Sequence, residues 1–298
     1  MEEMLKTIDV DIVCPIYKDS LTLRALVDSF KLQKNVNIKK IVFPLTLSHT
    51  AEDDVIRKII KDNGIVSFEM EKENFSHSLT REKAIRDYCS SKIVILLSQD
   101  VKLEREDTFY NLVKDIDSGE TVYNYARQIC KNHSIERYIR KKNYPAKSYY
   151  VEQKDIEKMR YMAYFSSDAC SALNREVFIK LNGYHGYDLM MCEDALYSKI
   201  ILENGYKKKY CADAVVEHSH KYTLKQVYKR YYDMGIFQST VSVFGDFDTG
   251  GSGLKLALYV FKEALIHFNI LVLLRWFPDM SARYFGMKKG KKEGKKKL

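Results

Sequence analysis

Residues 10–19, with the sequence V-D-I-V-C-P-I-Y-K-D, define the first unit of the fold. A β-branched apolar run over residues 10–14 ends at Pro15, and an amphipathic segment over residues 21–34 follows it. A short apolar run that leads into a segment of helical period is typical of a β-α unit, in which a covering helix follows a buried strand. The chain therefore begins as an α/β protein does.

The same alternation continues through the first third of the chain. Further strand-like runs and amphipathic segments cover residues 41–45, 53–63, 65–69, 78–89 and 93–97. Strands that alternate with helices form a largely parallel sheet. Ligands of such sheets bind beyond the carboxyl ends of the strands. We therefore expect residues 15–19 and 98–101 to meet at one edge of the sheet and to carry the chemistry.

The second half of the chain has a weaker pattern. Residues 118–160 are polar and rich in tyrosine and lysine, and we interpret them as a surface insertion or a mobile acceptor loop. Regular elements then resume, and Thr223 is the predicted N-cap of the last of them. The expected elements are strands at residues 170–173 and 210–217, and helices at 175–181, 193–203 and 223 to about 235.

The composition indicates a folded protein of a reducing compartment. Of the 298 residues, 46% are hydrophobic and 12% aromatic, which excludes a disordered chain. The six cysteines form no C-x-x-C pair and no zinc-binding spacing, so we expect buried thiols. The N-terminus lacks the basic and apolar regions of a signal peptide. A cytoplasmic location is the expectation.

The formal net charge of +9 arises largely at the C-terminus, where residues 287–298 contain seven lysines and one glutamate. Such a tail can meet nucleic acid or anionic lipid, or it can be a solvated terminus. Charge alone leaves these three interpretations open.

Residues 254–277 are apolar but are interrupted by charged side chains such as Lys255 and Lys262. The uninterrupted apolar run is far below the roughly 18 to 20 residues that span a bilayer. Two interpretations remain: a helix or helix pair lying in the membrane interface, or an ordinary helix packed on the main domain. Trp276 and the lysines that follow it favour the interface.

Three groups of acidic or imidazole residues stand at predicted strand ends or at a helix start. They are Asp100, the pair Glu193 and Asp194, and the pair His218 and His220. Each alone has an ordinary explanation, as a turn residue, a helix N-terminal acid or a polar surface. Together they suit a sugar-nucleotide transferase. Asp100 and a histidine would hold Mn²⁺ or Mg²⁺, and the Glu193 pair would remove the acceptor proton.

Over about residues 9–237 the chain resembles glycosyltransferase family 2 and, within it, the bacterial rhamnosyltransferases. The resemblance depends on D-I-V-C-P-I-Y-K (11–18), F-S-H-S-L-T-R-E (75–82), L-L-S-Q-D-V (96–101), S-S-D-A-C-S-A-L-N-R-E-V-F (166–178), N-G-Y (182–184), C-E-D-A (192–195) and A-V-V-E-H-S-H-K-Y-T (214–223). The combination of F-x-H-x-x-T-R, Q-D and H-S-H is rhamnosyltransferase-like, whereas P-x-Y and E-D are typical of the whole family.

This resemblance implies a GT-A fold: an α/β domain with a mostly parallel sheet flanked by helices, here extended by C-terminal helices that associate with the membrane. It implies that Pro15 and Tyr17 line the nucleotide site, that Asp100 is the metal-binding aspartate and that Asp194 is the base of an inverting reaction. The family's D-x-D motif is reduced here to S-Q-D (98–100), with Gln99 on the donor side.

The remaining site residues follow from the same resemblance. His218 or His220 would complete the metal site, and Arg81 and Arg230 would neutralise the departing diphosphate. The helix N-terminus at Glu193 would keep the base ionised. The implied donor is dTDP-rhamnose. The implied acceptor is a polyprenyl-linked cell-wall or capsular saccharide at the cytoplasmic face of a bacterial membrane.

The expected domains are a catalytic domain over residues 1–237, divided into a nucleotide-binding half (1–101) and an acceptor and catalytic half (102–237), and a C-terminal helical region with a polybasic tail (238–298). The second strand leads into F-P-L-T (43–46) with no aspartate to recognise the base, so the nucleotide stays open. Residues 226–231 match the Q-x-x-R-W motif of processive relatives only loosely, which favours single-sugar addition.

Three alternatives remain at this stage. One is a family 2 transferase that uses another nucleotide sugar, such as a UDP-hexose. Another is a sugar nucleotidyltransferase, although residues 15–19 lack the glycine-rich loop that this chemistry needs. The third is a basic nucleic-acid-binding module, which only the lysine tail supports; we expect no nucleic-acid partner.

Overall fold

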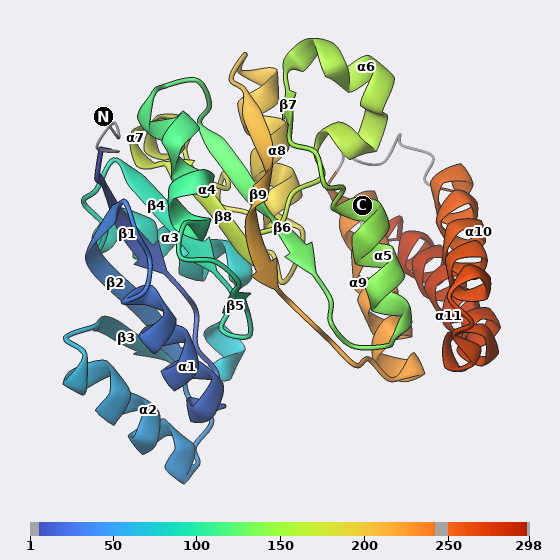
Figure 1. Cartoon of the computed structure of the whole chain (residues 1–298), viewed down its shortest axis with the longest axis horizontal. Helices are drawn as coiled ribbons and strands as arrows, with labels where there is room; N and C mark the ends of the chain where they lie inside the picture. Colours follow the sequence, from blue (N-terminus) through green and yellow to red (C-terminus); the bar gives the residue numbers. More distant parts are fainter. Residues whose placement is uncertain (1–5, 242–249, 297–298) are drawn as a thin grey trace. The chain divides into compact units, whose positions relative to one another are not determined.

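The computed structural model describes residues 6–241 and 250–296, which form two compact units (Figure 1). The first unit comprises Met1–Arg127, Ala146–Glu157 and Ala163–His218. The second comprises Gln128–Pro145, Lys158–Met162 and Ser219–Leu298. Residues 242–249, within the expected C-terminal region, lie outside the described part of the chain.

The first unit is built on one sheet with the strand order β3-β2-β1-β4-β8-β6-β9-β5, and β7 pairs with β9. The strands are β1 (Ile8–Val13), β2 (Val36–Thr46), β3 (Val66–Met70), β4 (Ile93–Leu97), β5 (Lys102–Leu103), β6 (Tyr123–Ile129), β7 (Tyr149–Val151), β8 (Cys170–Asn174) and β9 (Lys208–Glu217). Strands β3, β2, β1 and β4 are parallel, whereas β8 joins β4 in antiparallel register. The expected α/β architecture is therefore confirmed, with a parallel N-terminal half and a mixed remainder.

Helices cover this sheet and form most of the second unit. The α-helices are α1 (Ser20–Phe30), α2 (Ala51–Asp62), α3 (His77–Asp87), α4 (Thr108–Asp117), α5 (Ile135–Asn143), α6 (Ile156–Met159), α7 (Arg175–Lys180), α8 (Glu193–Glu203), α9 (Leu224–Thr240), α10 (Gly250–Ile266) and α11 (Ile270–Gly294). Short 3₁₀ turns occupy η1 (Lys72–Asn74), η2 (Gln153–Asp155) and η3 (Arg160–Ala163). Thr223 caps α9 as expected, in a reciprocal capping box with Gln226.

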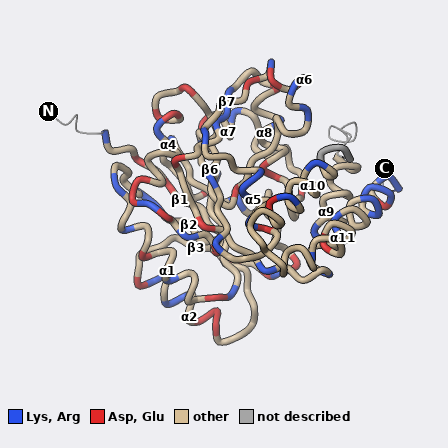
Figure 2. The backbone as a smooth tube through the Cα atoms, turned by 45° about the vertical axis from the view of Figure 1, so that its right-hand side comes forward, with Lys and Arg blue, Asp and Glu red and all other residues tan. Residues whose placement is uncertain are grey.

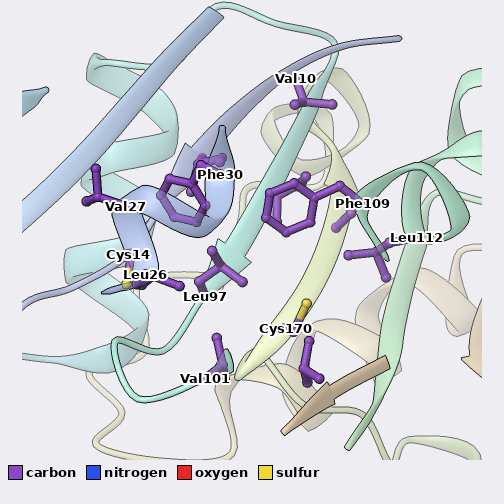
Figure 3. Packing of buried hydrophobic residues seen from close by; sticks show 14 of the residues in the cluster. Val10, Cys14, Leu26, Val27, Phe30, Leu97, Val101, Phe109, Leu112 and Cys170 are labelled. Carbon is purple, nitrogen blue, oxygen red and sulfur yellow. The ribbon is translucent and has the colours of Figure 1, made fainter. Parts of the chain in front are cut away.

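The core of the first unit joins α1 and α4 to the central strands. Phe30 of α1 and Phe109 of α4 have ring centroids 5.9 Å apart, and Val10 and Leu97 lie in the same apolar cluster (Figure 3). The chain enters α1 through Asp19, whose side chain accepts a hydrogen bond from the Thr22 amide at 3.1 Å. This cap fixes the turn that follows β1.

The interpretation of residues 118–160 as a surface insertion is wrong for β6. Tyr123 and Tyr125 are at most 1% exposed, because β6 pairs with β8 inside the sheet. Asn124 is equally buried, and its Nδ2 donates to the Leu112 carbonyl oxygen at 2.8 Å. A buried strand can have a polar sequence when its polar side chains form hydrogen bonds with other parts of the fold.

In the second unit, α11 packs on α9 through glycines. Gly286, Gly290 and Gly294 recur every four residues on α11, so they lie on one face. A methyl group at Gly290 would overlap the Tyr232 carbonyl oxygen of α9. As far as Gly294 the lysine-rich stretch is part of helix α11 (Figure 2). Lys288, Lys289 and Lys292 are exposed there, so the interpretation as a solvated, disordered terminus is wrong only about the disorder. Lys297 and Leu298 lie outside the described residues.

We expect Gly290→Ala to destabilise this helix pair. The added methyl group forces the two backbones apart, and overpacking of this kind costs about 1–3 kcal/mol. Thermal unfolding followed by circular dichroism measures the effect. Gly253→Ala on α10 is the matched control, since nothing lies within 4 Å of its added Cβ and alanine favours helix. An unchanged melting temperature for Gly290→Ala would refute the close packing.

Helices α10 and α11 form a hairpin whose inner faces pack together. The Trp276 ring packs against Phe261 in a tilted arrangement, with centroids 5.1 Å apart, and its Nε1 donates to the Ala257 carbonyl oxygen at 2.8 Å. Trp276 therefore serves the helix pair itself. Within residues 6–241 and 250–296, no helix combines the length and apolar character needed to cross a bilayer.

Candidate active site

A hollow of about 380 Å³ lies beyond the carboxyl ends of β1 and β4. Residues that follow the two strands line it, as the sequence predicts for an α/β sheet. Five of the predicted site residues are among its walls: Pro15, Tyr17, Arg81, Gln99 and Asp100. The other lining residues are Ile16, Thr46, Lys72, Phe75, His77, Leu97, Ser98 and Met190.

Gln99 ties the two strand ends together. Its Oε1 accepts from the Tyr17 amide at 2.9 Å, and its Nε2 donates to the carbonyl oxygens of Lys18 and Asp19. A single amide side chain thus satisfies three backbone groups of the loop after β1. The Tyr17 ring is 39% exposed, and the ammonium groups of Lys18 and Lys72 lie 5.1 and 5.6 Å from its centroid.

Asp100 and His218 come together at one side of the first unit. The Oδ1 of Asp100 and the Nε2 of His218 are 3.3 Å apart, although Asp100 follows β4 and His218 follows β9. The Asp100 side chain is 45% exposed and that of His218 is 12% exposed. A carboxylate oxygen and an imidazole nitrogen at this separation are donors that suit Mn²⁺.

Arg81 is the buried cation of the hollow, with 2% of its surface exposed. Its Nη1 donates to Glu193 Oε1 at 2.5 Å and lies 3.0 Å from His77 Nδ1. Burial would lower the pKa of Arg81, but the Glu193 and Asp168 carboxylates outweigh it and raise that pKa. No described residue accepts from the Nε of Arg81. A buried donor of this kind is suited to an anion in the hollow.

Glu193 and Asp194 begin α8 after Cys192, whose φ is +65°. Glu193 is directed to Arg81, whereas Asp194 accepts from the Ala195 amide at 2.7 Å. Burial raises the pKa of Asp194 well above its ordinary value, and the carboxylates of Glu193 and Asp168 raise it further. Burial and the neighbouring like charges thus oppose the helix N-terminus, which is expected to favour the ionised carboxyl.

The sequence did not single out Asp168, which is 3% exposed beside Arg81. Its carboxylate accepts from Tyr123 Oη at 2.6 Å, Ser171 Oγ at 2.5 Å and Tyr184 Oη at 3.3 Å. Burial raises the pKa of Asp168, an effect that Arg81 opposes. The one sequence signal was its place in the S-S-D-A-C-S motif, directly before the buried strand β8.

His220 and Arg230 belong to the second unit. The His220 ring stacks on Tyr222 with centroids 4.9 Å apart, and the Arg230 guanidinium lies 5.5 Å from the same tyrosine ring. The His220 carbonyl oxygen accepts from Asn132 Nδ2 at 2.9 Å. These contacts order the segment that continues from His218 into α9.

Two curated proteins are similar to the chain over most of their length, while no protein-family profile matches it. The O-antigen chain rhamnosyltransferase RfbN of Salmonella typhimurium is 28% identical over 288 residues, which are 95% of this chain and 89% of that protein. The O-antigen chain rhamnosyltransferase WbaN of Salmonella anatum is 27% identical, over 87% of this chain and 82% of that protein.

Solved structures of glycosyltransferases share the fold. The mannosyltransferase PcManGT from Pyrobaculum calidifontis, in complex with GDP-Man and Mn²⁺, has a TM-score of 0.56 at 15% identity. The match covers 94% of this chain and 74% of PcManGT. GalNAc-T7 with UDP, GalNAc and Mn²⁺ has a TM-score of 0.55 at 13% identity, and the match covers 72% of this chain and 44% of GalNAc-T7. S. aureus TarS has a TM-score of 0.55 at 12% identity, and the match covers 86% of this chain and 44% of TarS.

At these identities the structural likeness establishes the fold alone, and it confirms the GT-A fold that the sequence motifs imply. The glycosyltransferase activity is assigned from the curated relatives, because their similarity extends over nearly the whole chain. The chain is thus a glycosyltransferase with the GT-A fold, similar along most of its length to O-antigen rhamnosyltransferases.

Proposed function

We propose that the protein is an inverting rhamnosyltransferase, which transfers L-rhamnose from dTDP-rhamnose to a lipid-linked saccharide in the synthesis of a bacterial surface polysaccharide. The observation that carries this proposal is the hollow after β1 and β4, which is lined by the buried Arg81 and by Asp100, whose carboxylate lies 3.3 Å from the His218 imidazole. A nucleotide sugar needs a cationic group and metal donors for its diphosphate. The identity of the transferred sugar is taken from the curated relatives, which are rhamnosyltransferases.

In this proposal residues 1–101 form the nucleotide-binding half and residues 102–237 the acceptor and catalytic half. Pro15, Tyr17 and Gln99 hold the nucleotide, and the exposed face of the Tyr17 ring offers a stacking surface for its base. Arg81 neutralises the diphosphate that leaves. Arg230, on the second unit, is proposed to assist it.

Asp194 is the proposed base. It removes the proton from an acceptor hydroxyl, whose oxygen then attacks the anomeric carbon from the face opposite the nucleotide, so the configuration inverts. The C–O bond to the diphosphate breaks, and its electron pair leaves with dTDP. A raised pKa brings this carboxyl nearer to neutral pH and makes its ionised form a stronger base. Glu193 remains paired with Arg81.

The donor set of Asp100 and His218 fits a hard divalent ion such as Mn²⁺ or Mg²⁺. His220, two residues further along the chain, is the proposed third ligand. When bound, such an ion supplies positive charge to the diphosphate of the donor.

A panel of nucleotide sugars tests the proposed donor. We expect the protein with Mn²⁺ to release nucleoside diphosphate from dTDP-rhamnose faster than from GDP-mannose, UDP-glucose or UDP-GalNAc. A preference for a UDP-hexose would instead identify a transferase of another sugar. Formation of inorganic pyrophosphate from dTTP and a sugar phosphate would identify a nucleotidyltransferase.

We also propose that the α10–α11 hairpin binds peripherally to the anionic cytoplasmic face of the plasma membrane. Apolar side chains around the turn between the two helices are strongly exposed, among them Phe268 at 87% and Leu274 at 74%. Lysines on the same helices add attraction of about 1 kcal/mol each near an anionic surface. A lipid-linked acceptor is confined to the bilayer, so docking there raises its effective concentration.

The double variant Phe268→Glu/Leu274→Glu is expected to lose flotation with phosphatidylglycerol vesicles and to keep transfer to a soluble acceptor. The charges oppose insertion of the turn, and neither residue belongs to the first unit. Leu32→Glu, at an exposed leucine in the first unit (61% exposed), is the matched control and should float like the wild type. High salt should weaken wild-type binding without abolishing it. A double variant that still floats would show that the membrane contact lies elsewhere.

A further inference from the structure

The second unit contains its own hollow of about 420 Å³, separate from the donor site and formed by α5, α11 and the segment before α9. Its polar lining includes Glu136 of α5, Arg275 and Asp279 of α11, and Lys221. None of the site residues expected from the sequence lies among its walls.

The two carboxylates that line this hollow, Glu136 and Asp279, belong to a network of buried, paired charges. Arg283 donates from Nη2 to Glu136 Oε1 and from Nε to Asp279 Oδ1, both at 2.6 Å, and from Nη1 to Tyr231 Oη at 2.8 Å. The Asp279 side chain is 2% exposed and that of Glu136 is 13% exposed. Arg275 lies 3.5 Å from Asp279 and donates to the Tyr222 carbonyl oxygen.

The charged groups that line the hollow nearly cancel, since the Glu136 and Asp279 carboxylates stand against Arg275 and Lys221. Burial alone would raise the pKa of Glu136, but Arg283 holds it below its ordinary value. A paired carboxylate still has lone pairs that can accept further hydrogen bonds. The hollow therefore presents acceptors, donors and little net charge. This combination offers a polyanion no net attraction, and it suits a ligand rich in hydroxyl groups.

The other walls are apolar. Val272 and Leu271 of α11 and the Tyr222 side chain complete the lining. A pyranose has a face of C–H groups as well as hydroxyls, so a mixed wall of this kind matches a sugar ring. Leu271 is also 74% exposed at the start of α11, next to the hairpin turn that we propose for membrane contact. One wall of the hollow thus adjoins the part of the unit that would face the lipid.

We propose that this hollow is a binding subsite for the saccharide of the acceptor, an uncharged hexose residue held by the Glu136 and Asp279 carboxylates and by Arg275 and Lys221. This inference rests on the proposed function and deepens it, because it assigns the acceptor to a defined place on the second unit. It goes beyond donor recognition, which belongs to the first unit.

Direct binding tests the proposal without any transfer reaction. Saturation-transfer NMR on the full chain, with the methyl α-pyranosides of galactose, mannose and glucose and no donor, should give a signal for at least one sugar. Lys221→Ala and Arg275→Ala should each weaken it about 10- to 100-fold in affinity, the equivalent of one or two charge-assisted hydrogen bonds. Lys221 is exposed, so its loss should leave the fold intact.

Lys225→Ala is the matched control: it removes a lysine of the same segment that is exposed and does not line the hollow. The proposal fails if no pyranoside binds, if Lys225→Ala weakens binding as much as Lys221→Ala, or if inorganic pyrophosphate occupies the hollow in place of the sugars. A separate donor assay keeps the two ideas distinct. Normal dTDP release with no saccharide binding would refute the subsite alone, whereas saccharide binding without dTDP release would refute the proposed function alone.

Discussion

Asp194→Asn is expected to lower turnover by about 10²- to 10⁴-fold and to leave donor binding nearly unchanged. The amide keeps the shape of the side chain but cannot accept the acceptor's proton, and general base catalysis contributes rate factors of this size. Steady-state release of dTDP in the presence of acceptor measures turnover, and titration with dTDP measures donor affinity.

The pH dependence of the rate adds a second readout. The pKa of Asp194 is raised by burial and by the neighbouring carboxylates, so its ionised fraction, and with it the wild-type rate, should grow as the pH rises through that pKa. The asparagine variant should lose this limb of the profile. A variant that keeps the wild-type limb would mean that another group is the base.

Glu193→Gln is the informative comparison. Glu193 forms the buried pair with Arg81, and removal of one partner of a buried ion pair is strongly destabilising, by about 3–5 kcal/mol. We therefore expect this variant to unfold more easily. If Glu193→Gln stayed folded and lost more turnover than Asp194→Asn, the roles of the two carboxylates would have to be exchanged.

Asp100→Ala should abolish transfer and metal binding while the protein stays folded. The Asp100 side chain is 45% exposed, so its loss should cost the fold little while it removes a metal donor. Electron paramagnetic resonance of free Mn²⁺ reports binding directly, and EDTA should abolish wild-type transfer until Mn²⁺ is restored. Asp213→Ala, at an exposed aspartate on β9, is the matched control and should bind Mn²⁺ normally. Full activity in EDTA would overturn the metal's role.

The local sequence was sufficient to predict a strand when all of the strand's residues are buried. Strand β4 was predicted with its observed bounds, because Ile93–Leu97 is apolar throughout and lies between parallel and antiparallel neighbours. The meeting of residues 15–19 with Ser98, Gln99 and Asp100 followed from the same rule about strand ends.

The sequence was insufficient where a residue's partner lies far along the chain. Strand β6 looked polar because Tyr123 donates to Asp168, 45 residues away, and Asn124 to the Leu112 carbonyl. Asp168 stayed unnoticed for the same reason. The raised pKa of Asp194 depends on burial and on Asp168, neither of which a local pattern specifies.

The glycine repeat on α11 shows a third case. Gly286, Gly290 and Gly294 recur at helical spacing, and lysines stand between them, so charge dominates the composition of this stretch. Helix packing uses only the glycine face, and the lysines occupy the others. A charge-rich segment can therefore be a packed helix when small residues recur every four positions.

The most direct test of the central claim is the mass of the product. The full chain is incubated with dTDP-rhamnose, Mn²⁺ and membranes that carry polyprenyl-linked saccharides, and the lipid fraction is analysed by mass spectrometry. We predict that one deoxyhexose is added per acceptor and that dTDP appears in equal amount. Release of dTDP with no deoxyhexose on the lipid, or addition of a hexose from a UDP-sugar in preference, would contradict the assignment of a rhamnosyltransferase.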